Sequence, residues 1–307
     1  MGTLLNSGDQ LQASQGVKAA VSCAGSPPLR VPPTQIYPVS YFCGNSNRTP
    51  LRQPEQIDSF PGGNDSTIPY LITPRRGGLL DDTPTLRWNP ISGVTRYTVR
   101  VVGSGVNWET EISGSEVVYS GEQVLQPGKV YSVIVEADNG TSSQWDEGAT
   151  DSGFKLVYPD VAERVRTKIN DIAQSELSPE AQALAMADLY FEEDLVSEAI
   201  ATLEPFVKAG STTVQVYQML GDLYRYSGLN LLAKERYEEA IALAASEDIE
   251  GQAAAQVGLA EVMVMLGNPS EAVNLLDEAQ VNYQQLGDSE RVEALQQRSL
   301  TLADSNR

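Results

Sequence analysis

The feature that most constrains this chain is a recurrence of small and large residues in its C-terminal part. Residues 217–244 read YQMLGDLYRYSGLNLLAKERYEEAIALA. Tyr190 and Ala199 stand 34 positions before Tyr224 and Ala233. A period of that length is typical of stacked helical hairpins, in which small residues let two helices approach and large residues fill the space around the contact. The spacing therefore predicts an architecture rather than a chemistry.

Two further copies of the pattern flank the middle one. The third copy lies 39 positions after the second, and its matching residues are Leu259, Ala260, Gly267, Ala272, Leu276 and Ala279. The copies depart from one another at single positions. In the first copy, Ala187 and Asp194 stand where the second copy has glycines. In the third copy, Met263 stands where the second copy has a tyrosine.

The pattern resembles that of tetratricopeptide (TPR) repeats. The second copy matches the family at Leu220, Gly221, Tyr224, Gly228, Ala233, Tyr237 and Ala240. The resemblance covers roughly residues 179–285 and implies three pairs of antiparallel helices stacked into a solenoid. We therefore expect residues 179–307 to hold three TPR repeats and a C-terminal capping helix. In that last helix Leu295 and Leu302 would pack on the third repeat, and the residues expected to face water are Glu293, Gln296, Gln297 and Arg298.

A connecting helix is expected ahead of the repeats, within residues 159–178. Its apolar residues fall on one helical face and are Val161, Val165, Ile169 and Ile172. Ser178 and Pro179 then read as the N-cap and the first residue of the next helix. The connecting helix either caps the array or joins it to the region before it.

Residues 70–158 predict short antiparallel strands separated by Gly-containing turns. Their large inward residues would be Trp88, Tyr97, Val99, Val101, Tyr131, Val133 and Val135. The run from Leu125 to Tyr131 fits a tyrosine corner, in which the Tyr hydroxyl bonds back to nearby backbone. This stretch resembles a fibronectin type III or immunoglobulin-like β-sandwich. The alternative is another small antiparallel β-domain.

Residues 1–69 predict a β-rich region followed by a Pro- and Gly-rich linker. The opening resembles the FecR-like β-domain of bacterial envelope proteins, and the matching residues are Leu5, Gly8, Asp9, Leu11, Gly16, Ala19 and Val21. We expect residues 44–68 to be a linker or long loop that buries little apolar surface. The predicted fold is thus multidomain: a β-rich region, a β-sandwich and an all-α TPR solenoid.

The composition of the chain argues against several classes of function. The formal net charge is −20, and residues 159–307 hold 26 of the 41 acidic side chains. Such a field repels a phosphate backbone, so we expect no nucleic-acid partner. Histidine is absent, which removes the commonest general base and the commonest zinc ligand. No Gly-rich phosphate-binding motif occurs, and no catalytic residue, metal or cofactor is predicted. No apolar run is long enough for a membrane span.

The two cysteines, Cys23 and Cys43, leave two alternatives open. They could pair as a disulfide, which would place the protein outside a reducing cytosol, or remain as two buried thiols. The first residues lack the basic start and apolar core of a signal peptide. We expect a periplasmic or envelope location, reached with a leader that this sequence does not contain; a cytoplasmic location is the alternative.

The TPR resemblance also implies a binding surface. In such arrays the first helix of each repeat lines a concave groove, and the implied partner-binding residues are Leu184, Asp188, Phe191, Glu192, Gln215, Gln218, Asp222, Arg225, Tyr226, Val257, Glu261, Val264 and Met265. The groove would be acidic with apolar patches and would suit an extended or helical peptide with basic or neutral flanks. Only Arg225 matches the family's carboxylate clamp, so we do not expect capture of an acidic C-terminus. Alternatively, these residues merely solvate a spacer.

The function expected from these features is a non-enzymatic scaffold that binds a protein or peptide partner. The order of modules resembles that of bacterial, cyanobacterial-type envelope proteins. The alternative is a structural or sensory envelope component that recognises its partner through the β-domains, with the repeats as a spacer. Exposed aromatic rings at Trp108 or Trp145 would favour that alternative. The sequence specifies neither the partner nor the oligomeric state.

Overall fold

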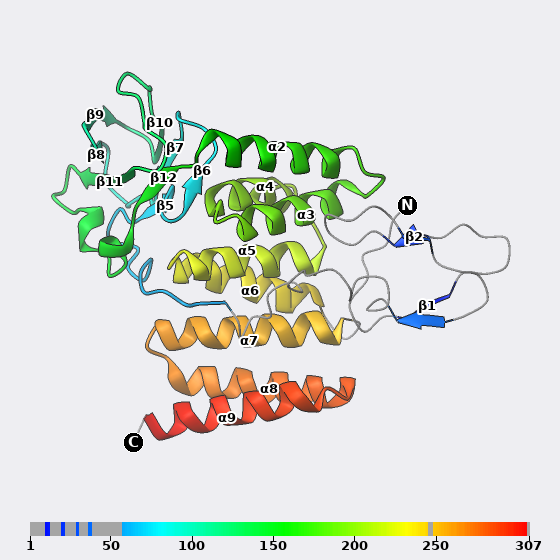
Figure 1. The fold of residues 1–307 in the computed structure, drawn as a ribbon. Helices are drawn as coiled ribbons and strands as arrows, with labels where there is room; N and C mark the ends of the chain where they lie inside the picture. The colour runs from blue at the N-terminus through cyan, green and yellow to red at the C-terminus, as the bar shows by residue number, and fades with distance from the viewer. Residues whose placement is uncertain are drawn as a thin grey trace.

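A computed structural model describes residues 57–244 and 248–305, together with four short strands before residue 57. The described part consists of a strand-rich region and an array of eight α-helices stacked one below the other (Figure 1). The helices are α2 (Pro159–Ala173), α3 (Pro179–Glu192), α4 (Val196–Lys208), α5 (Val214–Tyr226), α6 (Asn230–Ala244), α7 (Ile249–Met265), α8 (Pro269–Leu286) and α9 (Ser289–Ser305).

Helices α3 to α8 form three successive pairs, and the recurrence seen in the sequence marks their contacts. The fully buried residues at equivalent positions are Ala199, Ala233 and Ala272, and, four positions later, Leu203, Tyr237 and Leu276. A Cβ added to Gly221 would lie 2.9 Å from the Tyr237 ring, and one added to Gly258 would lie 2.3 Å from it. Glycine at both positions therefore lets α5 and α7 approach the large ring of α6. The predicted repeat spacing is confirmed in the helical array.

The turns inside the pairs share one backbone conformation. Asp194, Gly228 and Gly267 have φ values of 60°, 65° and 76°. This left-handed region favours glycine, and aspartate is one of the few other residues that enter it. The replacement of glycine by Asp194 in the first copy therefore preserves the turn.

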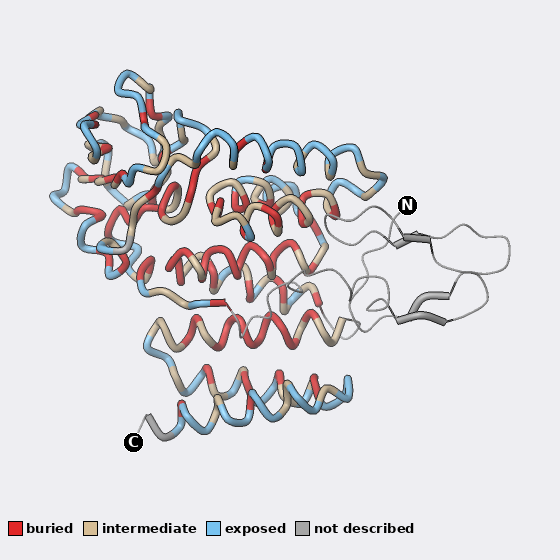
Figure 2. Tube along the Cα trace, in the orientation of Figure 1, coloured by how far each residue is buried: buried red, intermediate tan, exposed pale blue. Residues whose placement is uncertain are grey.

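Local sequence signals set the helix ends. Ser178 caps α3, since its Oγ accepts a hydrogen bond from the Ala181 N–H at 3.3 Å, and Pro179 begins the helix, as predicted. Asp248 caps α7 in the same way, by accepting from the Gly251 N–H at 2.8 Å. Helices α5 and α7 are buried almost all round, whereas α2 and α9 keep long exposed faces (Figure 2).

The strand-rich region from residue 71 onward contains two sheets. Their strands are β5 (Leu71–Thr73), β6 (Gly78–Leu79), β7 (Thr85–Trp88), β8 (Tyr97–Gly103), β9 (Val106–Ile112), β10 (Glu116–Val118), β11 (Val130–Ala137) and β12 (Phe154–Leu156). One sheet has the order β10-β7-β5 and the other the order β6-β12-β11-β8-β9. All pairings are antiparallel except β12 with β6.

Side chains from both sheets meet in one hydrophobic cluster. The predicted inward residues are all buried in it: Trp88, Tyr97, Val99, Val101, Tyr131, Val133 and Val135. The Tyr131 hydroxyl accepts a hydrogen bond from the Gln126 N–H at 2.8 Å, the contact expected of a tyrosine corner. Trp108, considered as an exposed ring, is buried instead, because it packs edge-on against Tyr119 at 5.2 Å between ring centroids. Trp145 is 62% exposed.

The strands before residue 57 form two small antiparallel pairs. They are β1 (Gln10–Gln12) with β4 (Ile36–Pro38), and β2 (Ala20–Val21) with β3 (Leu29–Arg30). Of the residues that carry the FecR-like resemblance, Leu11 lies in β1 and Val21 in β2, and the others lie outside the described residues. Cys23 and Cys43 also lie outside them, so their pairing stays a prediction.

Candidate peptide-binding surface of the helical array

The predicted groove residues lie on α3, α5 and α7, and most of them are covered. The buried ones are Leu184, Phe191, Asp222, Arg225 and Val257. The half-buried ones are Asp188, Gln215, Gln218, Tyr226, Glu261, Val264 and Met265, and Glu192 is exposed. The predicted surface is therefore largely in contact with other parts of the chain.

Three of these residues are engaged by neighbouring helices. The Tyr237 hydroxyl donates to Asp222 Oδ1 at 2.5 Å, so Asp222 lies between α5 and α6. Glu261 forms a two-point ion pair with Arg298 of α9 at 2.6 and 2.8 Å. The expectation that Arg298 faces water is therefore wrong: α9 lies close enough to α7 for this pair to form. Gln215 donates to Asp248 Oδ2 at 3.4 Å, between the second and third pairs.

The three turns inside the helix pairs meet a segment that precedes them in sequence. We call residues 193–195, 227–229 and 265–268 the turn edge, and residues 57–80 the docking segment. In Figure 1 the first part of the docking segment runs in blue past α5 and α7 toward the sheets. At the first turn, the Gly78 N–H donates to the Asp194 carbonyl at 2.7 Å.

The second turn holds the docking segment through its backbone. The N–H groups of Asn230 and Leu231 donate to the Gly62 and Gly63 carbonyls at 3.3 and 3.2 Å. These two donors belong to the first turn of α6, where a helix supplies no internal acceptor. The fully buried Asn230 side chain donates to the carbonyl oxygens of Phe60 and Gly62 at 3.2 and 3.0 Å. The array thus holds this segment through its backbone carbonyl oxygens.

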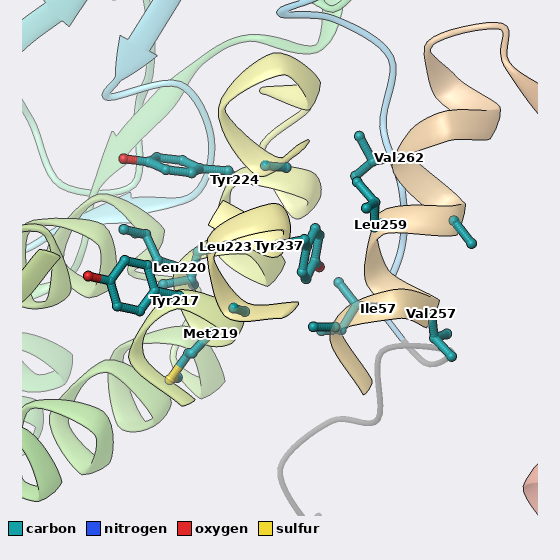
Figure 3. Packing of buried hydrophobic residues seen from close by; sticks show 14 of the residues in the cluster. Ile57, Tyr217, Met219, Leu220, Leu223, Tyr224, Tyr237, Val257, Leu259 and Val262 are labelled. Atoms are coloured by element: carbon teal, nitrogen blue, oxygen red, sulfur yellow. The ribbon is translucent and has the colours of Figure 1, made fainter. Parts of the chain in front are cut away.

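The third turn and α7 complete the contact. Asn64 donates through Nδ2 to the Met265 carbonyl at 3.4 Å. Ile57 is buried in the same cluster as Val257 and Leu259 of α7 (Figure 3). Ile68 is buried in that cluster as well. The expectation that residues 44–68 bury little apolar surface is therefore wrong for the part from residue 57 onward.

An aromatic cluster anchors the docking segment beside the second turn. The Phe60 and Tyr226 rings meet edge-on at 5.7 Å between centroids, and Phe191 and Tyr226 do so at 5.0 Å. The Arg76 guanidinium lies 3.4 Å from the Phe60 ring centroid. Stacked aromatic and cation–π contacts of this kind are typical of a recognised side chain. One of the predicted groove residues, Tyr226, thus contacts this chain's own Phe60, and a second, Phe191, packs against Tyr226.

Glycines permit the close approach of backbone to backbone. A Cβ on Gly228 would stand 2.5 Å from the Pro61 carbonyl oxygen, and one on Gly63 would stand 2.8 Å from Leu229 Cα. Gly62 and Gly63 also have φ values of 123° and 58°. The Gly62–Gly63 pair therefore serves a packing contact with the turn edge.

A buried ion pair ties the docking segment to the sheets. Arg75 and Asp146 pair at 2.5 Å, each 3% exposed at its side chain. The Arg75 Nε also donates to the Ser227 carbonyl at 2.6 Å, and Asp146 Oδ1 accepts from the Gly63 N–H at 2.8 Å. One arginine thus joins three parts of the molecule. Arg75 is therefore buried, because these partners surround it.

A second polar junction connects β7 with the array. Both guanidinium Nη atoms of Arg87 donate to the Glu204 carboxylate of α4, and the Tyr224 hydroxyl donates to it at 2.6 Å. Burial raises the pKa of Glu204, but the hydrogen bonds from Arg87 and Tyr224 outweigh it and hold the pKa below its ordinary value. Burial and the neighbouring Glu204 charge raise the pKa of Tyr224. Glu204 therefore stays ionised at this junction.

The pKa of Glu198, in α4 just after the first turn, is shifted in the opposite direction from that of Glu204. Its Oε1 accepts a hydrogen bond from the Leu80 N–H at 2.7 Å. Burial raises the pKa of Glu198 to about 7, and the neighbouring Asp81 adds to the shift. The carboxyl thus changes charge near neutral pH at a contact between the docking segment and α4.

Sequence reasoning missed Asn230 and the docking segment. The sequence features that mark them are weak in isolation: an Asn at the start of a helix, and two Gly-Gly pairs of the kind found in many turns. Neither has the periodicity that identifies a packed face.

Within the described ranges no cluster of three or more acidic or cysteine side chains is placed to hold a metal ion. No helix in those ranges has both the length and the apolar character that a membrane span requires.

Comparisons with known proteins give a limited result. No family model matches the chain, and no curated protein matches it. Among solved structures, MamA is similar over 48% of this chain and 91% of its own, with 17% identity and a TM-score of 0.34. A kinesin light chain of Podosopora anserina with nearly identical TPR-like repeats is similar over 47% of this chain and 86% of its own, with 20% identity and a TM-score of 0.33. Likeness at this level identifies no function, which must be argued from the array itself.

Proposed function

We propose that this protein is a protein-interaction scaffold whose helical array binds an extended polypeptide along α3, α5 and α7. The observation that carries the proposal is that the array holds a non-helical polypeptide segment already, namely its own residues 57–64. The contact uses helix N–H groups, the Asn230 amide and an aromatic ring, which are the groups that recurring peptide-binding modes employ.

The charge of the array adds a preference. Residues 159–307 carry 26 acidic and 10 basic side chains, counted from the sequence. A field of that sign speeds encounter with basic or neutral segments and disfavours acidic ones. The proposed partner is therefore a polypeptide without a cluster of negative charge, bound through backbone and aromatic contacts.

A photo-crosslinking experiment tests the proposal. A crosslinking residue at Glu192, the one exposed member of the predicted groove set, is expected to capture a partner polypeptide in cells. The control position is Glu238, an exposed glutamate on α6 that was not predicted to line the groove. Capture from Glu238 alone, or from neither position, would contradict binding on the predicted surface.

A second candidate function is recognition through the strand-rich region, with the array as a spacer. We propose that the two sheets form an immunoglobulin-like sandwich, which the strand order, the buried Trp88 and the Tyr131 contact support. Trp145 favours this candidate, because its ring is 62% exposed beside the sheets. Under this candidate function, Trp145→Ala should abolish partner capture, whereas charge changes on α3 should leave capture from Glu192 unaffected. That pair of results would favour recognition through the strand-rich region over binding on the helical array.

We also keep an envelope location as a proposal. It depends on a disulfide between Cys23 and Cys43, which a thiol titration under denaturing conditions tests directly. Two titratable thiols in protein isolated from its native compartment would contradict it.

A further inference from the structure

We propose that residues 60–64, Phe-Pro-Gly-Gly-Asn, act as an internal ligand that occupies the partner site, and that the partner displaces them with a segment of the same chemistry. That chemistry is an aromatic residue followed, two positions later, by a Gly-Gly pair. The inference rests on the proposed function, since it names the kind of segment that the array would bind.

The site selects this chemistry through three contacts. Tyr226, itself packed against Phe191, meets one aromatic side chain edge-on, and the Arg76 guanidinium lies over that ring. Next to this cluster, a Cβ on Gly63 would stand 2.8 Å from Leu229 Cα, and Gly62 and Gly63 have φ values of 123° and 58°. The second and third residues after the aromatic one must therefore be glycines.

Asn230 fixes the register of the bound segment. Its Nδ2 reaches the carbonyls of Phe60 and Gly62 and the side-chain oxygen of Asn64, all within 3.2 Å. The neighbouring N–H groups of α6 bond the Gly62 and Gly63 carbonyls. A segment with glycines at the places of Gly62 and Gly63 can offer these carbonyl oxygens in the same backbone conformation, so such a segment of a partner can replace the internal one.

Within residues 60–64 the side chains contribute little burial, since Pro61 is exposed and Phe60 and Asn64 are half-buried. The buried apolar residues Ile57 and Ile68 lie on either side of this segment and not within it. The segment's advantage is covalent attachment, since a tethered segment competes at an effective concentration of roughly millimolar. A free partner segment therefore does not bind at this site until the contacts of the internal segment are weakened or the partner segment is preorganised.

A peptide-binding experiment on the full chain tests the inference. The probe is a fluorescent synthetic peptide of residues 57–66, IDSFPGGNDS, and the readout is its anisotropy. Phe60→Ala weakens the internal segment, so this variant is expected to bind the probe at least tenfold more tightly than the unaltered chain. Adding Asn230→Ala to Phe60→Ala is expected to reduce that binding at least tenfold, whereas adding Asn274→Ala, an exposed asparagine on α8, should not change it.

A second variant guards against a folding defect at Asn230. Tyr226→Ala, combined with Phe60→Ala, removes the aromatic contact without touching Asn230 and is expected to weaken the probe as well; circular dichroism reports whether each variant keeps its helices. Equal binding of the probe by the unaltered and Phe60→Ala chains, or no binding by either, would overturn the inference. So would a dimer of the unaltered chain that the probe leaves intact, because a second copy would then be the occupant.

The failure of this inference is distinguishable from the failure of the proposed function. If Glu192 captures a partner but Phe60→Ala does not bind the probe, the scaffold proposal stands and the internal-ligand proposal falls. If the probe binds as expected and no partner is captured at Glu192, the site is internal only.

Discussion

The middle and the end of the helical array use similar helices in different surroundings. Helix α5 has ten buried residues among its thirteen, including Asp222 and Arg225. Helix α9 buries Leu295 and Leu302 and leaves Leu300 55% exposed. The difference shows that position, rather than helix propensity, decides which faces are covered. The middle pair lies between neighbouring pairs and also carries the docking segment, whereas α9 ends the array in the described structure.

The largest expected effect comes from removing the same side chain in the two surroundings. Leu223→Ala in α5 should lower the free energy of unfolding by about 3 kcal/mol, because Leu223 is fully buried and its loss leaves a cavity. Leu300→Ala in α9 should change it by less than about 0.5 kcal/mol. Urea denaturation followed by circular dichroism measures both. Similar losses for the two variants would break the comparison.

The buried pair that ties the docking segment to the sheets should matter nearly as much. Asp146→Ala leaves Arg75 as a buried charge without its carboxylate partner, so we expect a loss of about 3 kcal/mol. The control is Asp81→Ala, which breaks an exposed pair with Arg166 and should cost less than about 1 kcal/mol. Comparable stabilities of the two variants would mean that the Arg75 junction is not formed.

Two glycines allow a comparison between two turns of the turn edge, one that contacts the docking segment and one whose glycine does not. Gly228 and Gly267 both have positive φ, but only Gly228 faces the docking segment, and a Cβ on Gly267 meets nothing within 4 Å. Gly267→Ala should cost about 1 kcal/mol from backbone strain alone. Gly228→Ala should cost about 2 kcal/mol or more, because its methyl group also collides with Pro61. Thermal denaturation of both variants measures the difference, and equal costs would place the docking segment elsewhere.

The smallest expected effect depends on pH. Since burial raises the pKa of Glu198 to about 7, the folded chain holds a proton there that the unfolded chain releases above its ordinary pKa of 4.5. The free energy of unfolding should therefore fall as pH rises from about 4.5 through 7. Glu198→Gln should make the protein more stable than the unaltered chain at pH 8 and leave it nearly unchanged at pH 4, as urea denaturation at the two pH values measures.

Glu193 provides a control of opposite sign. Burial raises its pKa, but Arg164 and Lys168 outweigh burial and hold it below the ordinary value. Glu193→Gln should therefore destabilise the protein slightly at pH 8, and the difference should vanish as pH falls through the pKa of the folded carboxyl. Stability profiles in which the two variants shift in the same direction would contradict the assigned environments.

The helical array was predictable because its determinants are local and repeated. The spacing of Ala199, Ala233 and Ala272 in the sequence identifies contacts between helices, and all three residues are fully buried. Alternation did the same for β8 and β11, whose inward residues are all buried. Each of these signals depends only on which side of an element a residue faces.

The docking segment was not predictable, for a physical reason. Its principal contacts run from backbone carbonyl oxygens to Asn230, and a carbonyl oxygen leaves no trace in the residue sequence. The burial of Arg75 was not predictable for a related reason, since its partners Asp146 and Ser227 lie 71 and 152 positions away in the sequence. Only the Gly pairs marked the places where backbones meet, and glycine marks many other features as well.

The central claim is that Phe60 and the residues after it are docked on the second turn of the edge. Nuclear Overhauser contacts between the ring protons of Phe60 and Tyr226 in the full chain test it most directly. The account predicts such contacts, because the two rings meet edge-on at 5.7 Å between centroids, and predicts their loss when the probe peptide displaces the segment. A Phe60 ring that shows contacts only to solvent or to its sequence neighbours would contradict it.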